Sequence, residues 1–243
     1  MRVSGLNNSN AMLAHLGANG NRVAKLMEQL STQKRVNVPS DDPVAASRLV
    51  QLSREQSAIK QYQSNITSLS GALSVQESHI TAMSNQVLAV SDKLKLANNS
   101  TLSQQDLAGY GAELESMLDS LVSTMNSKNE NGSYLFSGTK TNSKAVELVD
   151  GKYVYGGNDN SRETIVANGV AITENTNVSH AFSGSGNDLE MLNKLKELSE
   201  KMQDPNLNYA DYQDDIAAMI DMTQSTSDSL GALFTDLGGR QNR

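Results

Sequence analysis

Residues 59–97 read IKQYQSNITSLSGALSVQESHITAMSNQVLAVSDKLKLA, and this stretch decides the fold class. Every seventh residue from Ile59 onward is apolar, and so is the residue three positions after each of them, except at Gln76. Eleven of these twelve positions are apolar, where about four would be expected from a hydrophobic content of 37%. The pattern predicts the seam of a left-handed coiled coil. Its first row consists of Ile59, Ile66, Leu73, Ile80, Val87 and Leu94.

A single seam cannot bury itself, so other helices must pack against it. Residues 103–125 and residues 209–237 carry apolar side chains at the three- and four-residue spacing of a helix face. A shorter helix is expected over residues 188–202, because Asp204-Pro205 ends it. These segments predict an elongated rod built as an antiparallel coiled coil or helical bundle.

Residues 132–186 have a different character, with short runs of β-branched and aromatic side chains. Asp150-Gly151 separates two such runs, and Asn168-Gly169 separates two more. Both dipeptides are typical of two-residue hairpin turns. The sequence therefore predicts a mainly α protein with a small β domain, residues 132–186, inserted into a helical rod formed by residues 41–131 and 187–243.

The stretch NVPSDDPVAASRLVQL, residues 37–52, places two adjacent aspartates before a proline. Paired carboxylates can hold a metal, but a metal site needs further ligands and the neighbouring sequence offers none. Ser40, Asp41 and Asp42 are good N-cap residues, and Pro43 suits a first helical turn because it has no N–H to leave unpaired. We interpret the four residues as a helix cap, with a partner-binding loop as the alternative.

The first 40 residues are weakly patterned and contain several glycines and asparagines, which oppose helix formation. We expect this segment to be disordered in the isolated chain and to fold against a partner during assembly. Loops carry recognition more often than cores do, so the junction between this segment and the rod is the expected place for assembly contacts. The candidate contacts are Lys34, Arg35, Asp41, Asp42 and Arg48.

Composition and motifs argue against catalysis. The chain has no cysteine, a net charge of −7 and no run of about 18 apolar residues. The N-terminus lacks the pattern of a signal peptide, and no basic patch indicates nucleic acid. The loop GGNDNS, residues 156–161, lacks the spacing of a calcium-binding loop, and the three histidines are isolated. We expect no catalytic residue, no metal, no cofactor, and neither a nucleic acid nor a membrane as partner.

Three stretches resemble the flagellin family. Residues 29–66, QLSTQKRVNVPSDDPVAASRLVQLSREQSAIKQYQSNI, resemble the N-terminal region of flagellin-type proteins. Flagellins usually have an alanine after the aspartate pair, where this chain has Pro43. That proline, with NGSYLFSGTKT at 131–141 and YVYGGNDNSRETIVANGVAI at 153–172, is more similar to the hook–filament junction branch of the family.

The resemblance implies a structural protein of the bacterial flagellum that is exported through the flagellar type III apparatus without a cleaved signal peptide and acts outside the cell. The implied partners are copies of itself in a ring, a neighbouring hook-associated protein on the hook side, a filament-side junction partner or flagellin, and an export chaperone. Family members usually continue past a segment like GGRQNR, residues 238–243, with a helix that pairs with the N-terminal segment. The resemblance therefore implies that half of the polymerisation element and the chaperone's docking site are missing from this sequence.

Two alternatives remain at the level of sequence. The chain could be a flagellin that builds the filament itself. It could also be a secreted binding module or enzyme that carries residues 132–186 on a helical stalk. Copy number in sheared flagella would separate the first alternative from a junction protein, and a substrate or metal bound to residues 132–186 would favour the second.

Overall fold

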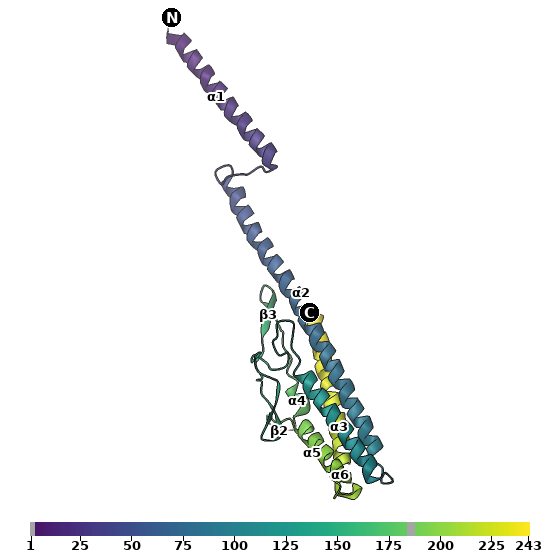
Figure 1. Ribbon diagram of the computed structural model, residues 1–243. Coiled ribbons are helices and arrows are strands. Elements are labelled where there is room, and N and C mark those ends of the chain that lie inside the picture. The colour runs from purple at the N-terminus through teal and green to yellow at the C-terminus, as the bar shows by residue number, and fades with distance from the viewer. Residues whose placement is uncertain (1–2, 184–187) are drawn as a thin grey trace. The chain divides into compact units, whose positions relative to one another are not determined.

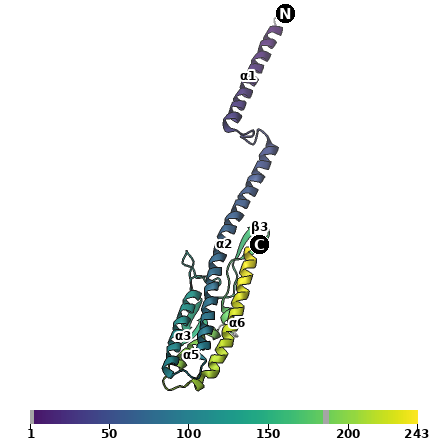
Figure 2. The same ribbon diagram turned by 90° about the vertical axis from the view of Figure 1, so that its right-hand side faces the viewer.

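The structure is a computed structural model that describes residues 3–183 and 188–243. Its described part is mainly helical with two short hairpins, which confirms the predicted fold class (Figures 1 and 2). The chain divides into two compact units, residues 1–61 and residues 62–243, and helix α2 contributes to both. The elements are α1 (Val3–Thr32), α2 (Pro43–Ala97), α3 (Gln104–Met125), β1 (Val146–Val149), β2 (Lys152–Tyr155), β3 (Glu163–Ala167), β4 (Val170–Thr173), α4 (Ser179–Phe182), α5 (Glu190–Gln203) and α6 (Tyr209–Gln241).

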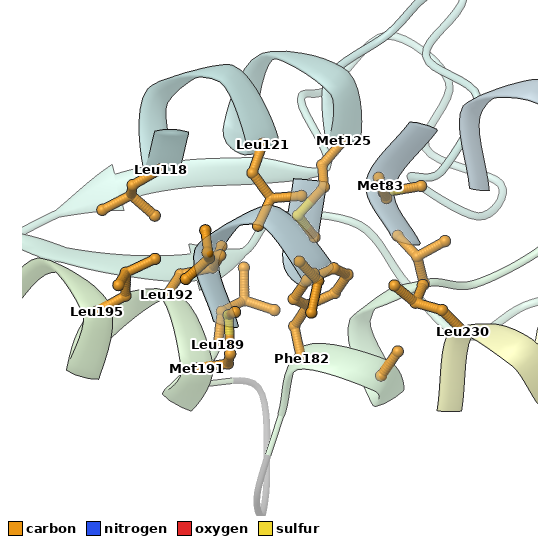
Figure 3. Packing of buried hydrophobic residues seen from close by; sticks show 14 of the residues in the cluster. Met83, Leu118, Leu121, Met125, Phe182, Leu189, Met191, Leu192, Leu195 and Leu230 are labelled. Carbon is orange, nitrogen blue, oxygen red and sulfur yellow. The ribbon is translucent and has the colours of Figure 1, made fainter. Parts of the chain in front are cut away.

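In residues 62–243 the second half of α2 packs with α3, α5 and α6 as a helical bundle (Figure 2). Helix α3 begins at a capping box in which Ser103 and Asp106 satisfy each other's backbone N–H groups. It returns antiparallel along α2, as the 2.5 Å ion pair between Lys93 and Glu113 and the 2.9 Å hydrogen bond from Gln86 to Ser120 indicate. Leucine, methionine and phenylalanine side chains from five helices meet between them (Figure 3).

The buried seam in the structure is shorter than the sequence pattern predicts. Leu73, Ile80, Val87 and Leu94 are buried, but Ile59 and Ile66 are 54% and 48% exposed. A seam is buried only where another helix covers it. Along α2 the contacts with α6 reach Glu77, which accepts a hydrogen bond from Gln241 at 3.0 Å. The prediction that Ile59 and Ile66 belong to the buried seam of the single chain is therefore wrong.

The β region consists of two separate antiparallel hairpins rather than one sheet. The β1–β2 turn has positive φ at Asp150 (50°) and Gly151 (80°), the backbone of a type I′ turn that the sequence predicted. In the β3–β4 turn only Gly169 has positive φ (74°), and the pairing shifts register between Ile165 and Ala167. The predicted boundary of the insert at residues 186–187 lies outside the described residues.

Two asparagine side chains attach the β1–β2 hairpin to the helices. The amide of Asn126, at the C-terminus of α3, accepts from the N–H of Val146 and donates to its carbonyl, both at 2.9 Å. The amide of Asn193 on α5 makes the same pair of bonds with Tyr153, at 2.6 and 2.9 Å. Each amide thus pairs with a strand edge as a neighbouring strand would.

The YLFSG phrase, residues 134–138, packs against the loop that follows β2. Phe136 is fully buried, and its carbonyl accepts a 2.8 Å hydrogen bond from the Tyr155 hydroxyl. Gly138 has φ of 69°, and a Cβ at this position would lie 2.0 Å from the carbonyl oxygen of Asn158. Asn158 in turn accepts from the N–H of Thr139 at 2.9 Å. The loop GGNDNS therefore serves packing within the insert.

Candidate assembly surface

The aspartate pair has two separate roles at the start of α2. Asp42 is the residue before the helix, and its Oδ1 accepts a 3.0 Å hydrogen bond from the N–H of Ala45, so it caps α2, while Pro43 occupies the first turn. Asp41 does not cap the helix. Its Oδ2 accepts from the N–H groups of Asn37 and Val38 at 3.1 and 3.3 Å.

Asp41 also fastens the loop to α1. Its Oδ1 lies 2.8 Å from Nζ of Lys25. The hydrogen bond from Lys25, followed by those from the two backbone N–H groups, lowers the pKa of the Asp41 carboxyl. Sequence reasoning missed Lys25, because nothing in the pattern relates it to a residue sixteen positions later. Within the described residues, Ser40 makes no side-chain hydrogen bond, so the proposed cap reduces to Asp42 and Pro43.

The loop and the first turns of α2 form a groove of about 680 Å³. Lys34, Arg35 and Arg48, which the sequence suggested as assembly contacts, all line it. Between these cations lie apolar side chains that the sequence analysis did not single out, chiefly Leu49 and Leu52, which are both exposed. Their three-residue spacing on one helix face was the available signal. We call this surface the basic groove.

Residues 1–61 expose apolar side chains well beyond the groove. Helix α1 carries a stripe at three- and four-residue spacing, and the early part of α2 adds more. A helix with an uncovered apolar stripe gains little stability by itself and is typical of a surface that another helix covers. The exposed residues are Met12, Leu13, Leu16, Val23, Leu26, Met27, Leu30, Val38, Val44, Leu49, Val50, Leu52 and Ile59.

The described residues offer little for chemistry. They contain no group of three or more His, Asp or Glu side chains that could hold a metal ion. His79 packs edge-on against Phe136, and its burial lowers its pKa. Burial raises the pKa of Tyr155, and the Tyr155 hydroxyl donates its hydrogen bond to the Phe136 carbonyl. In the part of the chain that the structure describes, no helix is long and apolar enough to span a bilayer.

Residues 3–141 match the family described as the bacterial flagellin N-terminal helical region. The chain belongs to this flagellin family. The match covers α1, the loop and the part of α2 that form the basic groove, the rest of α2, the whole of α3, and the YLFSGTKT phrase.

Relatives of this flagellin-family chain carry consistent names. Flagellar hook-associated protein 3 of Salmonella typhimurium is 36% identical over 151 residues, 62% of this chain and 44% of the relative. A solved structure from Vibrio parahaemolyticus, described as a flagellar hook-associated protein, is 35% identical with a TM-score of 0.77 and covers 84% of this chain and 90% of its own. Hook-associated protein 3 of Legionella pneumophila shares the fold, with a TM-score of 0.71 at 16% identity over 80% of this chain and 92% of its own.

The flagellin-family chain spans less than half the length of the curated relatives that it matches, 44% in Salmonella typhimurium and 42% in Escherichia coli.

The Asp41 contacts predict a pH dependence. A carboxyl whose pKa is lowered by folding stabilises the folded loop fully above its unfolded pKa of about 4, and this stabilisation is lost as the pH falls through the lower folded value. We expect the amide NMR signals of Asn37 and Val38 to titrate with a midpoint below that of an ordinary aspartate. Lys25→Gln should raise the midpoint, and the control Lys34→Gln should not. Equal midpoints in all three proteins would show that Lys25 does not hold Asp41.

Proposed function

We propose that this protein is a structural subunit of the bacterial flagellum that joins the hook to the filament by polymerising. The observation that carries the proposal is the uncovered apolar face of residues 12–59 in a chain of the flagellin family. In a subunit that works alone this face would favour aggregation, whereas in a polymer it supplies contact area. The proposed role is mechanical, and we propose that the protein is not an enzyme.

The names of the relatives support a position at the flagellar hook. Proteins that are 35–36% identical to this chain are described as flagellar hook-associated proteins, one of them as hook-associated protein 3. We propose the same place for this chain, outside the cell, after export without a cleaved signal peptide. The proposed partners are copies of itself in a ring, a hook-associated protein on the hook side, and flagellin or a filament-side junction partner. An export chaperone is a further proposed partner.

The test is deletion of the gene, followed by electron microscopy and a flagellin immunoblot of the medium. A junction protein should leave hooks without filaments and flagellin shed into the medium. A flagellin should leave hooks without filaments and no flagellin in the medium. Normal filaments in the deletion strain would rule out both roles, and restoration by the gene in trans is the necessary control.

A further inference from the structure

Charge is segregated along this chain. Residues 1–61 contain eight Lys and Arg against four Asp and Glu, so they carry a net charge of +4. Residues 62–243 contain twelve Lys and Arg against 23 Asp and Glu, so they carry −11. The chain's net charge of −7 therefore conceals two units of opposite sign. Two copies of such a chain attract each other where unlike units meet.

Three of the eight cations of residues 1–61 line the basic groove, namely Lys34, Arg35 and Arg48. Arg35 pairs with Asp42 at 3.1 Å, but its side chain remains 79% exposed. Among the described residues, no carboxylate pairs with Lys34 or Arg48. The groove thus combines free cations with the exposed apolar side chains Leu49 and Leu52.

A complementary surface lies on α6. Asp214, Asp221 and Asp228 are exposed and seven residues apart, so they form one line along the helix, about 10 Å from one to the next. Other acidic residues of α6 have partners, since Asp215 pairs with Lys201 and Asp236 with Arg240. For Asp214 and Asp221 no cation lies within ion-pair distance in the described part of the chain. We call this line and the small side chains beside it the acidic face.

The surface of α6 also has room for apolar groups. Ala218 and Ser225, one turn before and after Asp221, are exposed and small. They border a groove of about 360 Å³ that also includes Met222. Leucine side chains of a partner that enter this groove would contact Met222, while cations of the partner at the rim of the groove would lie near Asp221.

We propose that the basic groove of one copy binds the acidic face of α6 on a second copy. Arg48 and Lys34 pair with the aspartates, and Leu49 and Leu52 pack over the small residues between them. The inference rests on the proposed function, because a polymerising subunit requires a contact between copies, and it specifies the surfaces that make this contact.

The contact joins two different surfaces, and this determines the kind of assembly. When one groove and one face are used, the pair still offers one free groove and one free face, so growth can continue. Because its rim is charged and exposed, the contact weakens as salt screens it. We expect association at 25 mM salt to be at least tenfold tighter than at 500 mM.

A charge-exchange experiment tests the pairing. The groove variant is Lys34→Glu with Arg48→Glu, and the face variant is Asp214→Lys with Asp221→Lys. Each alone should associate at least tenfold more weakly than the unaltered chain by sedimentation velocity at high protein concentration and low salt. An equal mixture should recover association, because the reversed groove meets the reversed face and the two unaltered surfaces meet each other.

Two controls distinguish the outcomes. Arg54→Glu with Lys60→Glu changes the net charge equally outside the groove and should not be compensated by the face variant. Since the chain has no cysteine, Leu52→Cys and Ser225→Cys proteins can be mixed under mild oxidation. They should form a disulfide-linked pair, whereas Leu52→Cys with Ser123→Cys should not.

Failure of the mixture to recover association, or no cross-link between Leu52→Cys and Ser225→Cys, would overturn the pairing. A cross-link that forms only within one chain carrying both cysteines would assign the contact to a single molecule instead and overturn it too. The proposed function would survive either result if gene deletion leaves hooks without filaments, so the two proposals fail separately.

Discussion

Replacing Ile80 with aspartate is expected to unfold residues 62–243, while the same replacement at Ile66 leaves the melting curve nearly unchanged. The two residues occupy the same row of the seven-residue repeat, but Ile80 is 1% exposed and Ile66 is 48% exposed. An unpaired carboxylate at Ile80 would replace buried methyl groups in the helical bundle, at a cost of about 4 kcal/mol or more. At Ile66 the new charge remains in water, and the expected change is within about 0.5 kcal/mol.

Urea unfolding followed by circular dichroism measures this difference directly. The two variants have a second readout, because Ile66 continues the exposed apolar row of Ile59 along α2, and we expect the polymer to cover both residues. Ile66→Asp should therefore reduce filament number in cells although the purified protein melts normally. Equal destabilisation by both variants would mean that the seam is buried as far as Ile66 in the isolated chain. Normal filament number with Ile66→Asp would mean that this face takes no part in assembly.

Replacing Gly111 with leucine is expected to separate α3 from α5. A Cβ at Gly111 would lie 2.9 Å from the carbonyl oxygen of Ser199 and 3.0 Å from Cβ of Met202, closer than such atoms normally approach. A leucine must push the two helices apart, and overpacking of this kind costs about 3 kcal/mol or more where backbone is in the way. Even Gly111→Ala should destabilise, in spite of alanine's preference for helices.

The matched control for this prediction lies two residues earlier. A Cβ at Gly109 would meet no atom within 4 Å. Gly109→Ala should therefore stabilise the protein by about 0.5 to 1 kcal/mol, the ordinary gain from removing glycine from a helix. Chemical denaturation of the three variants measures the set. If Gly111→Ala stabilises as much as Gly109→Ala, the close approach of α3 to α5 is not rigid.

The sequence was most informative where local pattern and final environment coincide. The seven-residue repeat predicted α2, the three- and four-residue spacing over residues 103–125 predicted α3, and Asp150-Gly151 predicted its hairpin turn. Each of these signals acts on the conformation of the backbone close to it in sequence. The extent of burial along α2 was not predictable in the same way, because it depends on how far α6 runs beside it. The repeat does not distinguish a position covered within the chain from one left uncovered.

The assembly surface shows the same limit. Lys34, Arg35 and Arg48 were suggested from their place in a junction, and the structure brings them to one groove. Whether they contact a partner remains a prediction. The sequence could not predict that Asp42 caps α2 while Asp41 binds the loop and Lys25, because both are good cap residues. It depends on the turn at Gln33, where φ is 55°, and on the approach of Lys25.

The amides of Asn126 and Asn193 have a further consequence for how this chain can diversify. Both bond only to main-chain N–H and C=O groups of the β1–β2 hairpin, at Val146 and Tyr153. Main-chain groups are the same whatever side chain the strand carries, so these two attachments do not restrict the identity of the outward-pointing residues. Leu148 and Val149, which are both exposed, can be exchanged while the attachment remains. The outward-pointing side chains of the hairpin can therefore be changed without breaking the four hydrogen bonds that attach it to Asn126 and Asn193.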